Sequence, residues 1–274
     1  MSVRQRRLIR RTHPLGQAVT VMALGGVLLV RSQVRSAYRR YALTRQVVGP
    51  IDLLILPAGS SVVDLPPVEL AALGDSGMAG VGVREVEKTL PAQVARRVAD
   101  RLGRPVHVVG YGRSGARTAD VLAEQVPRVR GAVDVAVVLV GVNDVIRLRP
   151  WPRLAQDVTQ LLDALCVLGA PVVLSSLPEF RAMTAIPPVP RLGLAVWAVF
   201  VRRLQQHIVR LRPDVVLVDV RGAVGGTFFR DAATMSPDAF HPSARGYGLI
   251  ADALAPAVAT AASSAPLRSE RLDA

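Results

Sequence analysis

The sequence predicts an α/β protein in which helices cover both faces of a five-stranded parallel sheet. From about residue 68 onward, short valine-rich runs alternate with longer segments of helical periodicity. The valine-rich runs are apolar on both faces, as expected for strands buried between two layers of helices. Together these observations predict a three-layer α/β/α sandwich.

The predicted elements alternate along the chain. The expected strands are residues 68–73, 106–109, 133–140, 171–175 and 215–220. The expected helices are residues 90–102, 118–129, 153–168, 192–211 and 244–259. Ligands bind such sheets at the carboxyl ends of the strands. We therefore expect the functional residues in the loops 74–82, 110–118, 141–147, 177–190 and 221–242.

The charge of the chain is concentrated at its N-terminus. The 274 residues carry a formal net charge of +13, and residues 1–45 contain ten arginines and no acidic residue. The remaining 229 residues therefore have a net charge of only +3, which argues against a basic nucleic-acid-binding surface. The single cysteine, Cys166, excludes an internal disulfide and a cysteine-rich metal site.

Residues 15–30 contain no charge and have arginines on both sides, which predicts an apolar helix that associates with a membrane. A retained anchor, a signal peptide and a helix in the membrane interface all remain open. The segment is shorter than the roughly 20 residues of a typical span, and no small-x-small cleavage site follows it. A soluble helix packed on the body is the alternative. Five arginines on each side leave the orientation open.

We expect four parts in the chain. Residues 1–45 form the basic segment with its apolar helix, and residues 46–67 form a connector punctuated by prolines. Residues 68–262 form the α/β domain. Residues 263–274 are expected to be a disordered tail.

The first predicted strand ends in Leu73-Gly74-Asp75-Ser76-Gly77, which indicates a tight turn that presents a serine hydroxyl. Ser76 is either a nucleophile or a plain turn residue, since Gly, Asp and Ser are ordinary turn formers. Taken alone, this motif favours the turn residue, because short motifs often occur by chance.

Three later loops change that balance. The second loop holds Gly112 and Gly115, and it matches neither a phosphate-binding loop nor a dinucleotide-binding fingerprint. The third holds Asn143, whose amide can either donate to a reacting atom or cap a turn. The last holds Asp238 three residues before His241, a spacing at which a carboxylate can orient an imidazole. His13, His107 and His207 have no comparable neighbour and are expected to be solvated.

These motifs, in this order, resemble the SGNH hydrolases, also called the GDSL-like lipase/esterase family. The resemblance covers roughly residues 68–260 and implies a flavodoxin-like sandwich. It implies that Ser76 is the nucleophile, His241 the general base and Asp238 its orienting acid. The implied oxyanion hole consists of the Ser76 and Gly115 N–H groups and the Asn143 amide, with Gly112 as the alternative glycine. No metal or organic cofactor is implied.

The resemblance and the apolar segment 15–30 together predict a membrane-associated serine esterase that cleaves a small-molecule or lipid-like ester through an acyl-enzyme. An acyltransferase and a carbohydrate O-deacetylase on the same scaffold are the alternatives, followed by a non-catalytic binding module. Asp75 is interpreted as a residue that ties down the nucleophile loop, and Asp144 and Asp231 rank below Asp238 as the triad acid. The apolar segment 192–200 is interpreted mainly as core, with the lining of an acyl groove or a membrane contact as the alternatives.

Overall fold

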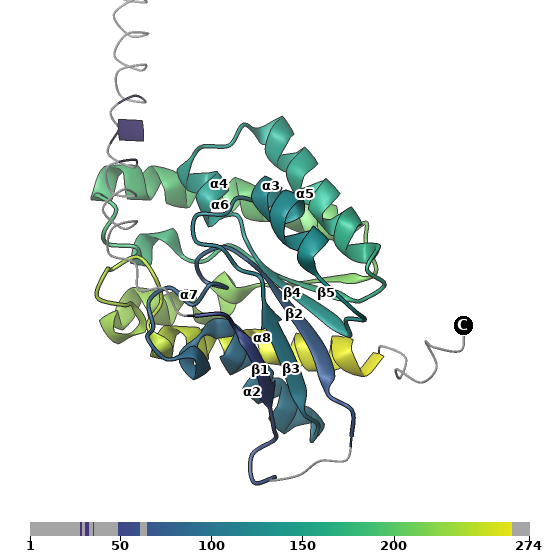
Figure 1. The fold of residues 1–274 in the computed structure, drawn as a ribbon. Coiled ribbons are helices and arrows are strands. Elements are labelled where there is room, and N and C mark those ends of the chain that lie inside the picture. Colours follow the sequence, from purple (N-terminus) through teal and green to yellow (C-terminus); the bar gives the residue numbers. More distant parts are fainter. Residues whose placement is uncertain (1–27, 29–30, 33–34, 36–48, 61–64, 265–274) are drawn as a thin grey trace, which may run out of the picture.

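The computed structural model describes residues 28, 31–32, 35, 49–60 and 65–264, which form a three-layer α/β/α sandwich (Figure 1). The sheet has the strand order β1-β3-β2-β4-β5-β6. Strands β2 to β6 are parallel, and β1 runs antiparallel to β3. The strands are β1 (Asp52–Ile55), β2 (Val68–Gly74), β3 (Val106–Gly110), β4 (Val135–Leu139), β5 (Val172–Ser175) and β6 (Val215–Val218).

The five strands predicted from the valine-rich runs are confirmed, but the predicted strand count is wrong. The sixth strand, β1, lies inside the segment 46–67 that the sequence marks as a connector. It is only four residues long, and Ile55 is its only buried residue. It pairs with β3 from Asp52↔Val109 to Ile55↔Val106, so the polypeptide enters the domain along the edge of the sheet.

His107 on β3 is not the solvated histidine that the sequence suggests. Its Nδ1 lies 2.7 Å from Glu69 Oε2 and its Nε2 lies 2.8 Å from Asp52 Oδ1. The two carboxylates raise the pKa of His107 by hydrogen bonding to its ring. These partners come from the strands on either side of β3 and are distant in sequence, so only the sheet register reveals them.

The helices follow the predicted order with three differences. The predicted helix 118–129 is divided into α3 (Thr118–Asp120), a π-helical turn η2 (Val121–Gln125) and a 3₁₀ turn η3 (Val126–Arg128). Two helices lie within predicted loops, namely α4 (Val142–Ile146) and α7 (Val220–Arg230). The remaining helices are α2 (Leu90–Leu102), α5 (Trp151–Cys166), α6 (Pro188–Val209) and α8 (Ala244–Ser264), and short 3₁₀ turns are η1 (Val86–Lys88), η4 (Phe180–Ala182) and η5 (Ala232–Thr234).

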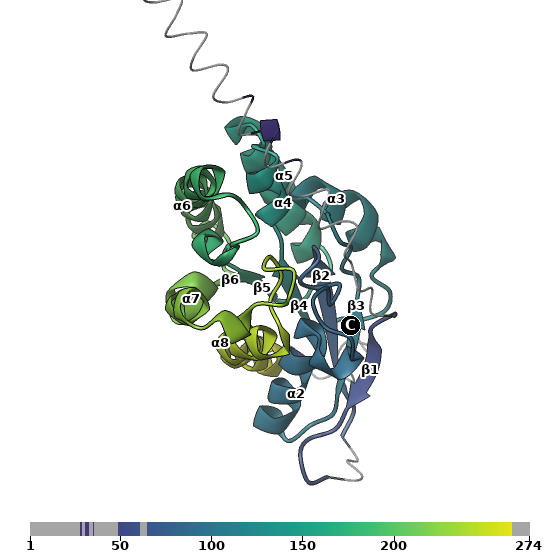
Figure 2. The same ribbon diagram turned by 90° about the vertical axis from the view of Figure 1, so that its left-hand side faces the viewer.

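The two faces of the sheet bury separate apolar cores. Helices α2 and α8 pack on one face, where Leu90, Val98 and Leu254 are fully buried. Helices α5 and α6 cover the other face with residues such as Leu161 and Val201. Figure 2 shows these two groups of helices on opposite sides of the strands. Burial of both faces stabilises the sheet and leaves its carboxyl edge to carry the functional loops.

The predicted apolar helix at residues 15–30 lies outside the described residues, except for Leu28. Leu28, Arg31, Ser32 and Arg35 are helical and exposed. Among the residues that the structure describes, no helix is both long and apolar enough to cross a membrane.

The sheet order changes direction between β2 and β4. The chain leaves β2 toward β3 on one side and returns to β4 on the other, which makes this pair a topological switch point. Gly74 ends β2 here with φ of +148°, and an added Cβ would lie 2.0 Å from the Leu139 carbonyl oxygen on β4. The Asp75 N–H donates to that same oxygen at 3.1 Å. Only glycine allows this close approach of the two strand ends.

We predict that Gly74→Ala destabilises the domain by about 3 kcal/mol or more, because the methyl group forces the two strands apart. Gly103→Ala is the matched control, since Gly103 also has a positive φ (+59°) but an added Cβ there meets nothing within 4 Å. The control is expected to lose only about 1–2 kcal/mol. Urea denaturation of both variants measures the difference, and equal losses would show that the contact with Leu139 is unimportant.

Candidate active site

Ser76 lies in the turn that follows β2 and faces a histidine that comes 165 residues later in the chain. Its Oγ is 3.0 Å from His241 Nε2, and His241 Nδ1 is 2.6 Å from Asp238 Oδ2. Ser76 and His241 are both buried, at 9% and 6% exposure. The structure therefore brings together the three residues that the sequence selects for the catalytic triad. The Ser–His–Asp chain has the connectivity that allows the imidazole to take a proton from the serine hydroxyl.

The loop before α8 holds Asp238 by several donors. Asp238 Oδ1 accepts hydrogen bonds from the Ser236 hydroxyl at 2.7 Å and from the Phe240 and His241 N–H groups at 2.8 Å each. Burial alone raises the pKa of Asp238, but hydrogen bonds and the proximity of His241 outweigh it and hold that pKa well below its usual range. Asp238 is therefore ionised at neutral pH and fixes the orientation of the imidazole.

The second and third loops supply further polar groups. Gly141, with φ of +117°, turns the chain after β4 into α4 and positions Asn143. Asn143 Nδ2 donates to the Ala116 carbonyl at 2.9 Å, which leaves its second N–H hydrogen for another acceptor. Within the described residues, the N–H groups of Ser76 and Gly115 donate to no protein acceptor. These groups have the chemistry that an oxyanion hole requires.

The alternative glycine, Gly112, has a packing role. An added Cβ there would lie 2.5 Å from backbone atoms of Met78 and Ala79, just after the nucleophile turn. Gly112 thus lets the second loop pack directly against the first.

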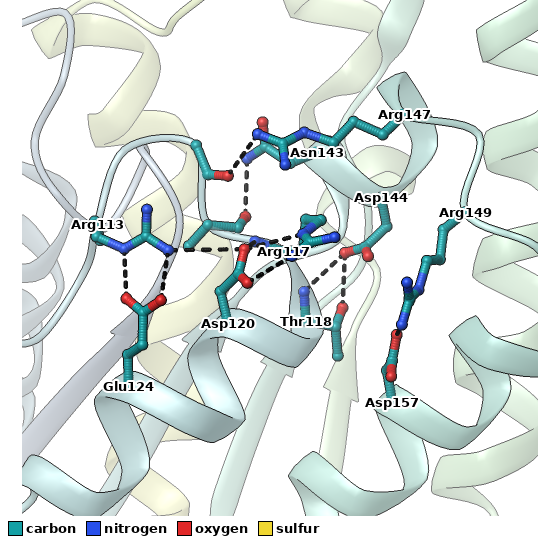
Figure 3. A network of polar contacts seen from close by, with 12 residues as sticks. Arg113, Arg117, Thr118, Asp120, Glu124, Asn143, Asp144, Arg147, Arg149 and Asp157 are labelled. Carbon is teal, nitrogen blue, oxygen red and sulfur yellow. Dashed lines mark hydrogen bonds and ion pairs between the residues drawn. The ribbon is translucent and has the colours of Figure 1, made fainter.

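A polar network beneath the second and third loops fixes their relative positions (Figure 3). Asp144, which is fully buried, accepts hydrogen bonds from the N–H and the hydroxyl of Thr118, both at 2.9 Å. Arg117 forms a two-point contact with Asp120 at 3.0 and 2.8 Å. Asp144 is thereby engaged away from His241. Asp231 is also occupied elsewhere, since it pairs with Arg245 and caps η5.

Asp75 is buried beside the nucleophile. Its Oδ1 accepts the Gly77 N–H at 3.0 Å, which supports its interpretation as a residue that ties down the loop. Its Oδ2 is buried and has no hydrogen-bond partner in the structure. Burial raises the pKa of Asp75 to about 7; the Gly77 N–H opposes this and nearby Asp144 adds to it. Two carboxyl groups near Ser76 thus have opposite tendencies, with Asp238 ionised and Asp75 readily protonated.

Gln125 is a residue of the site that sequence reasoning missed. Its Oε1 accepts the Gly74 N–H and its Nε2 donates to the Gly74 carbonyl, both at 2.8 Å. Gln125 is 1% exposed and ends the π-helical turn η2. Such turns often occur at functional sites. Glutamine in a predicted helix gives no signal of this role, because the wider π turn that directs it toward Gly74 is visible only in three dimensions.

A narrow cavity of about 60 Å³ lies next to Ser76 and His241, and its exposed lining is almost wholly apolar. Ala182 and Met183, from the loop 177–190 that was expected to hold functional residues, form part of its wall. Representative lining residues are Met183, Val220, Val224, Phe228 and Ile250. No three His, Cys, Asp or Glu side chains within the described ranges are grouped to hold a metal ion.

The model of the GDSL-like lipase/acylhydrolase family matches residues 72–249. The chain belongs to this family. The match covers both strand ends at the switch point and every residue of the Ser76–His241–Asp238 chain. It agrees with the resemblance drawn from the motifs around Ser76, Asn143 and His241.

The sequence identity between this chain and one curated member of the GDSL-like family is below 30%. A GDSL-like esterase of Mycobacterium tuberculosis is 29% identical over 191 residues, which is 68% of this chain and 60% of that protein. The aligned part of the chain therefore spans about 60% of the length of this curated relative.

Solved structures show the same fold. An esterase of Pseudoalteromonas sp. has a TM-score of 0.55 at 16% identity, covering 70% of this chain and 97% of that one. An acetylxylan esterase of Geobacillus stearothermophilus has a TM-score of 0.50 at 18% identity, covering 70% and 94%.

We predict that Gln125→Met slows catalysis and destabilises the domain. The variant leaves the buried Gly74 N–H without its partner, at a cost of about 2–3 kcal/mol. It also loosens the turn that holds Ser76, so kcat is expected to fall about 10- to 100-fold with little change in KM. Steady-state hydrolysis of a p-nitrophenyl ester and urea denaturation measure the two effects. Gln156→Met, at an exposed position of α5, is the control and should change neither.

We predict that Asp75 makes the domain less stable as the pH rises. The pKa of Asp75 is raised from 3.8 to about 7, so the folded state keeps a proton that the unfolded state has released between these values. The free energy of unfolding should therefore fall across this window and level off above it. Asp75→Asn should remove this component, amounting to about 1.4 kcal/mol per pH unit within the window.

Urea denaturation of wild type and Asp75→Asn from pH 5 to pH 8 tests this prediction, since the difference between the two proteins cancels other titrating groups. Asp214→Asn, at an exposed position, is the control and should follow wild type. Parallel pH profiles for wild type and Asp75→Asn would contradict the raised pKa.

Proposed function

We propose that this GDSL-like family member is a serine ester hydrolase that works through an acyl-enzyme. The observation that carries the proposal is the chain of contacts from Ser76 Oγ to His241 Nε2 (3.0 Å) and from His241 Nδ1 to Asp238 Oδ2 (2.6 Å). Family membership supports the same reaction class.

In this mechanism, Ser76 Oγ attacks the ester carbonyl carbon while His241 Nε2 takes the hydroxyl proton. The imidazolium formed is stabilised by ionised Asp238. When the tetrahedral intermediate collapses, His241 returns the proton to the leaving alcohol. A water molecule then attacks the acyl-enzyme with His241 again as the base, which releases the acid and restores Ser76.

The charge of the tetrahedral intermediate would be stabilised by the N–H groups of Ser76 and Gly115 and the side-chain amide of Asn143. The support for this assignment is that both N–H groups lack a protein acceptor and that Asn143 is held by Ala116 with one N–H hydrogen to spare. One such donor typically contributes about 3–4 kcal/mol to transition-state stabilisation.

The cavity beside Ser76 favours a short acyl group. Its volume is about 60 Å³, less than half of the roughly 150 Å³ of an engineered cavity that holds benzene. A chain of about two to four carbon atoms fits this space, and longer chains would extend outside it. The small volume also gives weight to the second candidate, an O-deacetylase that removes acetyl groups from a carbohydrate.

Association with a membrane through residues 15–30 is part of the proposal. It is supported by sixteen successive uncharged residues flanked by the ten arginines of residues 1–45. In this arrangement the arginines contact lipid headgroups and the apolar segment enters the bilayer.

Hydrolysis of p-nitrophenyl acetate, butyrate, octanoate and palmitate tests the proposed reaction. We expect kcat/KM to be highest for acetate or butyrate and at least 10-fold lower for octanoate. Ser76→Ala should lower kcat by about 10⁴- to 10⁶-fold and abolish labelling by a fluorophosphonate probe. Ser263→Ala, at an exposed position of α8, is the control. Turnover that survives in Ser76→Ala would exclude Ser76 as the nucleophile, and a preference for palmitate would exclude the cavity as the acyl site.

A further inference from the structure

Helix α6 carries an exposed stripe of apolar side chains on the outside of the sandwich. The stripe consists of Val189 (75% exposed), Leu192 (62%), Val196 (53%) and Phe200 (44%). Their spacing of three or four residues puts them on one face of the helix. The opposite face packs into the core through Leu194, Ala198 and Val201. Figure 2 shows α6 at the periphery of the molecule.

Two tryptophans extend this apolar surface. Trp151, at the start of α5, is 39% exposed, and its ring lies 5.9 Å from the ring of Trp197 on α6. Trp197 in turn lies 6.2 Å from Phe200. We call Val189, Leu192, Val196, Phe200, Trp151 and Trp197 the α6 patch. Contiguous exposed apolar surfaces of this kind mark interaction sites, and aromatic side chains of this type are common at membrane interfaces.

The charges around the α6 patch indicate what it binds. The same helical face continues past Phe200 with Arg203, His207 and Arg210, all exposed. From residue 180 to residue 213 the chain has six arginines and no acidic residue. Within the described residues, Arg191, Arg202, Arg203 and Arg210 form no ion pair. An apolar stripe that passes into a basic stripe on one helix face is complementary to an anionic lipid surface.

We propose that the α6 patch docks onto an anionic bilayer surface, with the apolar side chains among the outer acyl chains and the arginines among the headgroups. Arg191, within the apolar half, can extend its guanidinium toward the headgroups while its methylene chain remains among the apolar side chains. This contact is separate from the N-terminal segment. It concerns where the protein binds and does not rest on the chemistry proposed for Ser76.

The helix that carries the patch is joined to one wall of the cavity beside Ser76. Met183 lines the cavity beside Ser76, and α6 begins at Pro188, only a few residues later. Docking of α6 therefore constrains one wall of the cavity directly through the chain.

The only two tryptophans of the chain are both in the α6 patch, so their fluorescence reports on this surface alone. The full chain is mixed with vesicles of phosphatidylcholine and phosphatidylglycerol (7:3) whose acyl chains carry bromine, a quencher that acts at short range. We expect a blue shift and at least a twofold loss of emission. Pure phosphatidylcholine or 0.5 M salt should weaken the effect, because the arginine contacts are electrostatic.

The double variant Leu192→Asp/Val196→Asp should lose most of this quenching even where the N-terminal segment keeps the protein on the vesicles. Val167→Asp is the matched control, because Val167 is 86% exposed at the end of α5 and lies outside the patch. Ser76→Ala should dock like wild type, so failure of the catalytic proposal is seen separately. Should the double variant not fold, Val196→Ser tests the same effect in the same direction.

Three outcomes would overturn the proposal. The first is flotation with the vesicles without tryptophan quenching, which would assign membrane contact to another part of the chain. The second is a dimer, detected by light scattering, whose tryptophans stay shielded when vesicles are added. The third is protection of the tryptophans from acrylamide in the vesicle-free monomer, which would mean that another segment of the chain covers the patch.

Discussion

The contact between the ends of β2 and β4 is the constraint on which the rest of the site depends. Gly74 has no side chain, so its backbone lies against the Leu139 carbonyl, and the Asp75 N–H bonds to that oxygen. Gln125 holds Gly74 from the other side through two hydrogen bonds. The nucleophile turn is therefore fixed by the backbone of β4 on one side and by the side chain of Gln125 on the other. A serine positioned in this way loses little conformational entropy when it reacts, which is the physical advantage of a rigid turn at a switch point.

The pKa values of the two carboxyl groups nearest the nucleophile are shifted in opposite directions, although burial raises both. Asp238 receives hydrogen bonds from Ser236, from two backbone N–H groups and from His241, and these favour its charged form. Asp75 receives one backbone N–H and is otherwise surrounded by protein, so its neutral form is favoured. The number of donors, more than the depth of burial, thus decides which carboxylate can stabilise an imidazolium. Asp75, next to Ser76 in sequence, thus lacks both the contact with His241 and the donors that would favour its charged form.

The parts of the fold that were predicted from the sequence are those that leave a periodic signal. Five strands lie in short, mostly apolar runs, four of which are rich in valine, and α2 has the same bounds as its prediction because Thr89 caps it and Gly103 ends it. Strand β1 was missed because four half-exposed residues in a proline-rich stretch carry no such period. Helix α7 was missed because its glycines indicate a loop, although Asp219 caps its first turn.

The site shows the same division between local and non-local signals. Ser76, Asn143, Asp238 and His241 stand in short motifs at strand ends, so their loops could be selected from the sequence. Gln125 could not, because its partner Gly74 lies 51 residues away and the contact depends on a π-helical turn. The pairing of His107 with Asp52 and Glu69 depends in the same way on the register of three strands. Long-range polar contacts between elements carry no local pattern.

Helix α6 shows how far a hydrophobic pattern alone can specify structure. The segment 192–200 is apolar around the whole helix, and a helix of this kind is usually buried. Here only Leu194, Ala198 and their neighbours on one face reach the core, since no helix among the described residues lies outside α6. The remaining apolar face is either exposed to water, which costs free energy, or in contact with another apolar medium. The basic residues that continue this face favour a lipid surface over a protein partner. A protein interface would have to desolvate several arginines that form no ion pair, whereas anionic headgroups would neutralise them.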